Sequence, residues 1–218
     1  MNKPTFDNDY WDQLWSKTLR EHADKVALRP PNTHLLTEIA TLPPGRALDA
    51  GCGHGAETLW LAARGWRVDA VDFSPTALTH ARSLAERAGQ AVAGRIDWIE
   101  GDLARWTPAP GRYDLVVCLY VHIAGTVEDM VERMASGVAP GGTLFLVGHR
   151  PIDPATGAAT LAANQVQVSV EAAVAALDPD AWEFLVAEER PRAHAGTGVD
   201  ALVCARRRAR EGSSGMQT

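Results

Sequence analysis

Short apolar segments alternate with segments of helical periodicity, and this alternation constrains the fold more than any other feature of the chain. Five segments of about five to seven residues have the character of buried strands: Arg46–Ala50, Arg67–Val71, Arg95–Ile99, Tyr113–Leu119 and Thr143–Val147. Strands that alternate with helices pair in parallel, because each helix carries the chain back across the sheet. The pattern therefore predicts a doubly wound α/β fold.

Three helices are predicted, one before the first of these strands and two in the gaps between them. Each begins at a side chain that can accept a hydrogen bond from the first helical turn, and each is expected to end at glycine or proline. Their expected starts and ends are Asn32 and Pro43-Pro44-Gly45, Ser74 and Gly89, and Thr126 and Pro140-Gly141-Gly142.

The pattern changes after the fifth strand. Pro151–Gln167 lacks a clear period and is expected to be a loop or short irregular helix over the strand ends. A helix over Ser169–Asp178 should follow, and then strands over Trp182–Glu188 and Asp200–Arg206. The linker Arg190–Gly198 is too short for a crossover helix, so the last two strands should pair antiparallel.

The chain of 218 residues fits one domain, which we place at residues 1–206, followed by a flexible tail at 207–218. The formal net charge is −6, with 21 basic and 27 acidic side chains. Nucleic acids and anionic membranes require a basic protein surface, so neither is an expected partner.

Cysteine usage and the start of the chain bear on location. Cys52, Cys118 and Cys204 are scattered, without the spacing of a disulfide framework or a zinc site, and no metal site is expected. The first residues are polar, and the chain contains no apolar run of membrane-spanning length. We therefore expect a soluble, cytoplasmic protein.

A glycine-rich turn follows the first predicted strand. Gly51, Gly53 and Gly55 follow Asp49, and this spacing differs from the GxGxxG of dinucleotide-binding turns. A carboxylate just before the turn repels a pyrophosphate and attracts an ammonium group. The turn therefore favours a cationic ligand.

Two further acids stand at the ends of the second and third predicted strands. Asp72 can accept hydrogen bonds from both hydroxyls of a ribose, and Asp102 can accept one from an adenine amino group. The carboxyl ends of parallel strands meet at one edge of the sheet, so the three acids should line one crevice. Each acid alone is equally well explained as a turn or cap residue.

At this point the chain resembles the class I S-adenosylmethionine-dependent methyltransferases over residues 30–150. The resemblance is carried by Asp49-Ala50-Gly51-Cys52-Gly53-His54-Gly55, Asp72, Gly101-Asp102-Leu103, Tyr113–Cys118 and Pro140-Gly141-Gly142. It implies a Rossmann-like sheet of seven strands in the order 3-2-1-4-5-7-6, with strand 7 antiparallel.

The resemblance also implies S-adenosyl-L-methionine as cofactor and a set of residues that bind it. The turn would hold the methionine part, the end of the second strand the ribose, the end of the third the adenine, and the backbone at the end of the fourth the α-amino group. The implied residues are Asp49, Gly51, Cys52 and Gly53; Asp72 and Phe73; Asp102 and Leu103; and Cys118.

The start of the chain resembles, more distantly, the thiopurine, halide and tellurite methyltransferases. There a Trp-containing helix folds over the cofactor, and Trp11 and Trp15 would share one helical face here. The resemblance implies that residues 1–28 form a lid with Trp15 against the cofactor. The alternative is that both indoles only anchor an amphipathic helix to the core.

Candidate catalytic residues follow the fourth and fifth strands: Tyr120, His122 and His149. Methyl transfer from a sulfonium depends mainly on positioning, so a general base is needed only for an acceptor that does not ionise by itself. Few residues remain outside the core fold, which favours a small-molecule acceptor attacked at O, N or S. A catalytically silent cofactor-binding scaffold and a nicotinamide-dependent oxidoreductase are the competing interpretations.

Overall fold

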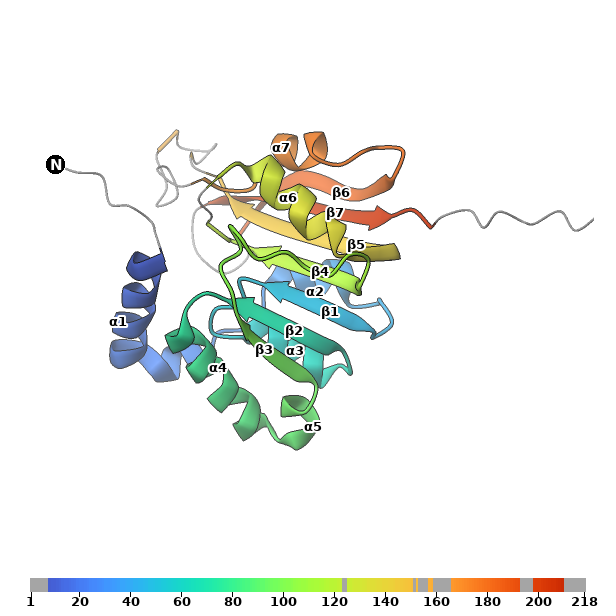
Figure 1. Ribbon diagram of the computed structural model, residues 1–218. Helices are drawn as coiled ribbons and strands as arrows, with labels where there is room; N and C mark the ends of the chain where they lie inside the picture. Colours follow the sequence, from blue (N-terminus) through green and yellow to red (C-terminus); the bar gives the residue numbers. More distant parts are fainter. Residues whose placement is uncertain are drawn as a thin grey trace, which may run out of the picture.

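The computed structural model describes residues 8–122, 125–150, 152, 157–158, 166–192 and 198–209. These residues form a twisted sheet with helices on both faces (Figure 1). The strands are β1 (Arg46–Ala50), β2 (Arg67–Asp72), β3 (Ile96–Glu100), β4 (Tyr113–Leu119), β5 (Val138–His149), β6 (Trp182–Pro191) and β7 (Val199–Arg207).

The strand order is β3-β2-β1-β4-β5-β7-β6 within the described residues. β1 to β5 pair in parallel, and β7 runs antiparallel to both β5 and β6. This arrangement confirms the predicted doubly wound α/β fold and the antiparallel pairing inferred from the short linker after β6.

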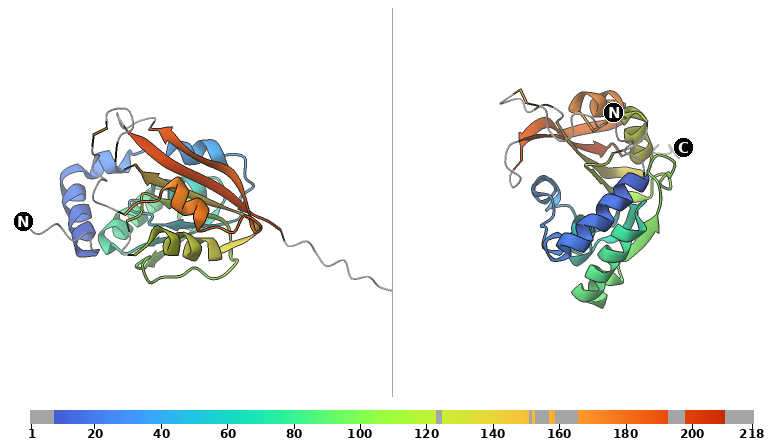
Figure 2. Two further views of the ribbon diagram at one scale, coloured as in Figure 1. Left: turned by 90° about the horizontal axis from the view of Figure 1, so that it is seen from above. Right: turned by 90° about the vertical axis from the view of Figure 1, so that its left-hand side faces the viewer.

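Apolar side chains cover both faces of the sheet. On one face α2, α3 and α4 pack against the strands through residues such as Leu35, Leu61 and Leu78, and on the other α6 and α7 pack through Met130 and Ala173. Figure 2 shows the layers from two further directions. The helices are α1 (Asn8–Ala27), α2 (Thr33–Ile39), α3 (Ala56–Ala63), α4 (Pro75–Ala88), α5 (Gln90–Ala93), α6 (Val127–Ser136) and α7 (Val170–Ala175).

The predicted helix starts are confirmed by their capping hydrogen bonds. The Asn32 side chain accepts from the amide of His34 at 2.9 Å, Ser74 accepts from Ala77 at 3.1 Å, and Thr126 accepts from Asp129 at 3.1 Å. Each oxygen satisfies an amide that has no partner inside its own helix. These caps hold the helices that face the carboxyl ends of the strands.

One predicted helix end is wrong. α6 ends at Ser136, and β5 already begins at Val138, so Pro140-Gly141-Gly142 lies inside the strand. The pairing of β4 with β5 shifts register between Tyr113 and Leu115. A bulge of this kind accommodates proline and glycine, because the local hydrogen-bond ladder is interrupted there.

At the C-terminus the last strand extends one residue beyond the predicted end of the domain at residue 206. Arg207, predicted to begin the tail, is the last residue of β7, and the tail residues 210–218 lie outside the described part. Most of the predicted loop Pro151–Gln167 and residues 1–7 of the predicted lid lie outside it as well. Residues 8–27 of this segment are helical, with a kink at His22.

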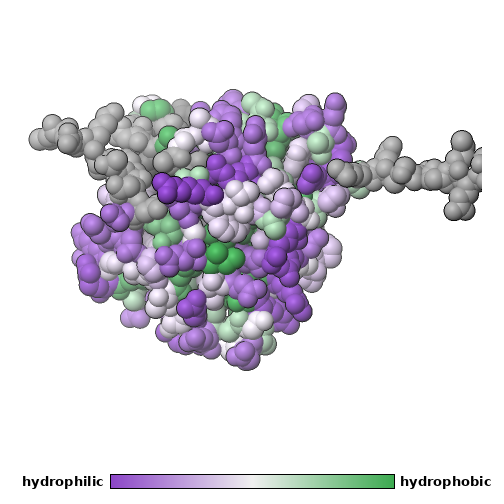
Figure 3. All heavy atoms as spheres, in the orientation of Figure 1, coloured by the Kyte–Doolittle hydropathy of each residue, from purple (hydrophilic) through white to green (hydrophobic). Residues whose placement is uncertain are grey.

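The surface seen in Figure 3 is mostly hydrophilic, with small separate hydrophobic areas. Among the described residues, no helix combines the length and the apolar character needed to cross a membrane.

Candidate active site

A cavity of about 950 Å³ opens at the carboxyl ends of β1 to β4. Its walls come from α1, the segment Arg29–His34, the turn after β1, the ends of β2, β3 and β4, Arg192 after β6, and the start of β7. Eleven of the thirteen residues predicted to form the site line it: Trp15, Asp49, Gly51, Cys52, Gly53, Asp72, Phe73, Asp102, Leu103, Tyr120 and His122.

The glycine turn lies close to two other walls of the cavity. Gly51 and Gly53 have φ of 80° and 50°, a region that glycine enters without steric cost. A Cβ atom on Gly51 would clash with the Val121 side chain, and one on Gly53 would lie 2.9 Å from the Trp15 ring. Both glycines are therefore required by the backbone conformation and by the close approach of the neighbouring walls.

Asp49 is buried behind the turn and accepts a hydrogen bond from the Thr58 hydroxyl. Burial, followed by the nearby charge of Glu57, raises the pKa of Asp49 to about 7. Removal from water makes an ionised carboxylate costly, and a nearby acid adds repulsion. A cation in the cavity would relieve both effects, so this position favours a positively charged ligand.

Asp72 fixes the glycine turn to the end of β2. Its two carboxylate oxygens accept from the amides of Gly53 and Ser74, each at 2.9 Å. Burial raises the pKa of Asp72. Asp102, at the end of β3, accepts from the amide of Ala104 at 2.9 Å. The three acids thus face one cavity, as the sequence predicts.

α1 lies across this end of the cavity. Its Asp12 accepts a hydrogen bond from the hydroxyl of Ser74, the residue that caps α4. Trp15 then lies beside the glycine turn, with its ring centroid 5.8 Å from that of His54, and Trp11 also lines the cavity. The helix and the α4 cap therefore place both indoles at the cavity wall.

His122 lines the cavity as a neutral ring. Its imidazole stacks on Trp11 with centroids 4.7 Å apart, and its Nδ1 lies 2.8 Å from Nε2 of Gln167. Burial, followed by the charge of His149, lowers the pKa of His122 to about 4. The ring is therefore uncharged at neutral pH.

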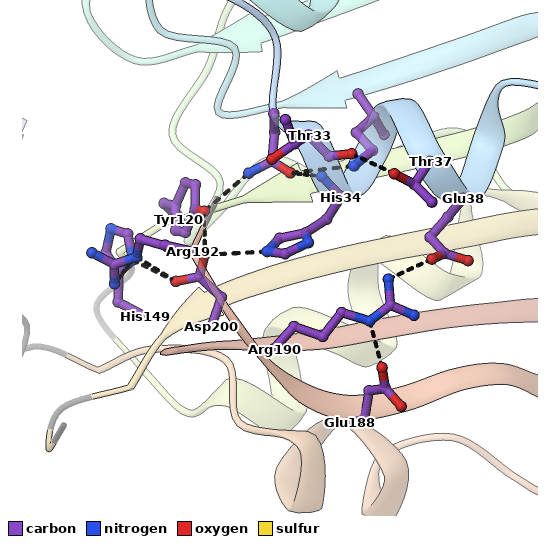
Figure 4. A network of polar contacts seen from close by, with 12 residues as sticks. Thr33, His34, Thr37, Glu38, Tyr120, His149, Glu188, Arg190, Arg192 and Asp200 are labelled. Atoms are coloured by element: carbon purple, nitrogen blue, oxygen red, sulfur yellow. Dashed lines mark hydrogen bonds and ion pairs between the residues drawn. The ribbon is translucent and has the colours of Figure 1, made fainter. Parts of the chain in front are cut away.

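A polar cluster around Asp200 forms the wall beyond Tyr120 (Figure 4). The fully buried Asp200 carboxylate accepts from the Tyr120 hydroxyl at 2.7 Å and from Arg192 Nε at 2.8 Å. His149 Nδ1 lies 3.1 Å from the same carboxylate, and His34 Nε2 lies 3.6 Å away. Burial opposes ionisation, but these hydrogen bonds outweigh it and lower the pKa of Asp200.

Two predicted site residues do not line the cavity. His149, predicted to face the transferred methyl group, lies behind Tyr120 with ring centroids 4.0 Å apart, because Asp200 and Arg192 hold its ring there. The Cys118 side chain is fully buried, with its sulfur 3.5 Å from that of Met130. The next residue, Leu119, lines the cavity instead.

Sequence reasoning missed several polar residues of the walls: Asn32 as a site residue, His34, Glu57, Arg192 and Asp200. Glu57 accepts from the backbone amide of Asn32 at 2.9 Å, and the Asn32 side chain donates to the Tyr120 hydroxyl at 2.9 Å. Glu57 directly follows the glycine turn, which was a usable signal. The others belong to separate segments of the chain, and no local spacing connects them.

The known proteins most informative for this chain are methyltransferases. Residues 47–142 match the methyltransferase domain family. The chain is 38% identical over 141 residues to a trans-aconitate 2-methyltransferase of Streptomyces avermitilis, covering 62% of this chain and 49% of that protein. It is 36% identical over 115 residues to ribosomal RNA small subunit methyltransferase C of Alcanivorax borkumensis, covering 50% of this chain and 34% of that protein. The chain thus spans half or less of these relatives.

The fold also matches solved structures. The N-methyltransferase NodS of Bradyrhizobium japonicum, in complex with S-adenosyl-L-homocysteine, superimposes with a TM-score of 0.68 at 22% identity, covering 92% of this chain and 99% of that one. This likeness establishes the Rossmann-like methyltransferase fold.

Among the described residues, no three His, Cys, Asp or Glu side chains gather as a metal centre requires.

Proposed function

We propose that this chain, whose residues 47–142 match the methyltransferase domain family, transfers a methyl group from S-adenosyl-L-methionine to a small-molecule nucleophile. The observation that carries the proposal is the set of three acids, Asp49, Asp72 and Asp102, around one cavity beside the glycine turn. Carboxylates at these strand ends suit a ligand that combines an ammonium, a ribose and an adenine.

The residues present fit this cofactor by their chemistry. Asp49 would hold the α-ammonium group, Asp72 the ribose hydroxyls, and Asp102 with Leu103 the adenine. The Nε2 atom of His54 is buried in the turn and has no hydrogen-bond partner among the described residues, so it offers one more polar contact for a ligand. When bound, S-adenosylmethionine supplies an electrophilic methyl group on a sulfonium.

The protein's own part in the reaction is positioning and exclusion of water. Trp11 and Trp15 cover the cavity from α1, and an indole face accommodates a cation while it excludes water. Tyr120 and His122 line the cavity after β4, with His122 against Trp11, and the acceptor would lie there. An in-line displacement requires the nucleophile about 3 Å from the methyl carbon, and these rigid walls would hold it there.

Charge supports a small acceptor rather than a nucleic acid. The chain carries a net charge of −6, and the acids at the cavity would repel a phosphate backbone. The relative from Alcanivorax borkumensis is named for ribosomal RNA, but this chain covers only 34% of it. The cavity volume of about 950 Å³ suits the cofactor with one small molecule beside it.

The proposal is tested by titrating S-adenosylhomocysteine and, separately, NAD into the full chain by calorimetry. We expect S-adenosylhomocysteine alone to bind. Asp72→Asn should weaken its binding at least about tenfold, since charge-assisted hydrogen bonds contribute about 1.5–3 kcal/mol each.

Asp97→Asn is the matched control, because Asp97 is an exposed carboxylate of the neighbouring strand β3 that does not line the cavity. Its affinity should equal that of the wild type. The cofactor assignment would be overturned if NAD bound more tightly than S-adenosylhomocysteine. It would also be overturned if Asp72→Asn and the wild type bound S-adenosylhomocysteine equally well and had the same thermal midpoint.

A further inference from the structure

The ring of Tyr120 is held from several directions at the end of β4. Its backbone has φ of 55°, a left-handed conformation that residues with a side chain rarely adopt, and its amide donates to the carbonyl of Val147 at 2.8 Å. Its hydroxyl donates to Asp200 and accepts from Asn32. The hydroxyl therefore already has a donor and an acceptor partner, and neither is a ligand.

One face of this ring is covered by protein. His149 stacks on Tyr120 with an interplanar angle of 24° and centroids 4.0 Å apart. His149 is itself held by Asp200 and Arg192, and it does not line the cavity, whereas Tyr120 does. The part of the Tyr120 ring that His149 and the hydrophobic core leave uncovered therefore lines the cavity, backed by a fixed imidazole.

The neighbouring wall is also flat and uncharged. His122, two residues further along the same loop, stacks within 5° of parallel on Trp11, and both line the cavity. Burial keeps His122 neutral, and burial followed by the nearby charge of Asp200 raises the pKa of Tyr120, so its phenol also stays neutral. Two charged residues of this end, Asp200 and Arg192, are paired with each other, and Arg29, which also lines the cavity, is exposed.

We propose that the acceptor is a molecule with a planar aromatic or heteroaromatic ring, which stacks on the cavity face of Tyr120. The inference rests on the proposed function, because it identifies the class of acceptor for that reaction. A stacked ring pair adds enough free energy to tighten binding about tenfold over a non-planar ring of similar size.

The competing class is an aliphatic polycarboxylate, as the name of the Streptomyces avermitilis relative indicates for that protein. Such an acceptor would need cationic groups at this end of the cavity. Arg192 is paired with Asp200 at 2.8 Å, which compensates its charge. Arg29 also lines the cavity, but it is exposed, and water weakens the attraction of an exposed cation for a carboxylate. The geometry therefore favours stacking over charge recognition.

The test compares planar and puckered probes on the full chain saturated with S-adenosylhomocysteine. Ligand-observed NMR titrations would use 3,4-dihydroxybenzoate against 3,4-dihydroxycyclohexanecarboxylate, catechol against cyclohexane-1,2-diol, and trans-aconitate. We expect each planar probe to bind at least about tenfold tighter than its saturated partner, with upfield shifts of its ring protons from stacking. The proposal would be overturned if the two probes of each pair bound with equal affinity, or if trans-aconitate bound more tightly than the planar probes. Failure of both planar probes to bind would overturn it as well.

Two variants assign the preference to Tyr120. Tyr120→Leu should reduce the planar preference to below about threefold, whereas Tyr120→Phe, which keeps the ring and loses the hydroxyl, should retain it. A preference that survives Tyr120→Leu would contradict the proposed stacking. If Tyr120→Leu fails to fold, the ring-proton shifts of the planar probes bound to the wild type decide whether stacking occurs.

S-adenosylhomocysteine binding distinguishes a failure of the proposed function from a failure of the inference about the acceptor. A wild-type protein that does not bind it contradicts the proposed function itself. A protein that binds it but shows no planar preference contradicts only the inference about the acceptor.

Discussion

The two ends of the cavity are built in different ways. The cofactor end comes from consecutive strand-to-helix turns, in which acids and glycines lie within a few residues of each other at the ends of β1, β2 and β3. The acceptor end joins Asn32, Tyr120, His149, Arg192 and Asp200, which come from five separate segments of the chain. The first end is a local motif, and the second exists only in the folded protein.

The largest expected effect is at the cofactor end, from Gly51→Ala. The new methyl group would clash with Val121 at a φ of 80°, so the turn must move. We expect S-adenosylhomocysteine affinity to fall about a hundredfold by calorimetry, because small displacements of a preorganised site are costly.

Gly111→Ala is the matched control for that substitution. Gly111 also has a positive φ, of 61°, but a Cβ atom there would meet nothing within 4 Å. Its thermal midpoint should fall by a few degrees from backbone strain while its affinity stays unchanged. A similar loss of affinity in both variants would show that backbone strain, and not the shape of the glycine turn, causes the weaker binding.

The next effect is at the acceptor end, from Asp200→Asn. The variant loses the buried charge that pairs with Arg192 and contacts His149, so the imidazole that backs the Tyr120 ring is held less firmly. We expect kcat/KM for the acceptor to fall about thirtyfold, mostly through KM, while S-adenosylhomocysteine affinity stays within about twofold.

Glu183→Gln serves as its control and should give wild-type kinetics, since the Glu183 side chain makes an exposed ion pair with Arg206 at 3.9 Å and does not line the cavity. If Asp200→Asn weakens cofactor binding as much as acceptor turnover, the two ends are not separable. The distinction between a local and an assembled end would then have no functional meaning.

Much of the fold can be predicted from local sequence patterns, and the errors in the prediction are local as well. Strand order, the antiparallel β7 and the caps at Asn32, Ser74 and Thr126 agree with the sequence prediction. Pro140-Gly141-Gly142 is misread as a helix end, because proline and glycine interrupt helices and mark strand bulges alike.

The same contrast explains which site residues could be predicted. Asp49, Asp72 and Asp102 each follow a recognisable strand, so their meeting at one edge of a parallel sheet is predictable. Asp200 starts the antiparallel β7, and its partners are set by how β7 pairs with β5. His149 faces Asp200 across that pairing, which no spacing along the chain encodes.

A smaller effect concerns pH at the cofactor end. The pKa of Asp49 is about 7 in the free protein, so its carboxylate becomes neutral as the pH falls through 7. An α-ammonium ligand requires the ionised form, and its own charge persists over this range. We expect the Kd of S-adenosylhomocysteine to be about tenfold higher at pH 6 than at pH 8.

Asp49→Asn should bind weakly at both pH values and remove this dependence. The stability of the protein supplies a second readout, because the pKa of Asp49 in the folded protein lies above its ordinary value of 3.8. Ionised Asp49 then destabilises the protein increasingly from about pH 4 to pH 7. The Asn variant should therefore melt above the wild type at pH 8, and a lower midpoint would contradict the buried charge.

The smallest effect is expected from the histidines of the acceptor end. His122 is neutral at pH 7. The side-chain carbonyl of Gln167 accepts a hydrogen bond from the backbone amide of His149, which fixes the orientation of the Gln167 amide group. The Gln167 NH₂ group therefore donates to Nδ1 of His122. The lone pair that a general base would use is therefore occupied.

His122→Gln and His149→Gln should each keep kcat within about fivefold, and the pH profile should follow the pKa of the acceptor when phenols of different acidity are compared. A general base would instead cost about 10² to 10⁴ in rate and give one profile for all acceptors. A loss of that size in either variant, with both substrates still bound, would make the acceptor end a catalytic centre rather than a positioning wall.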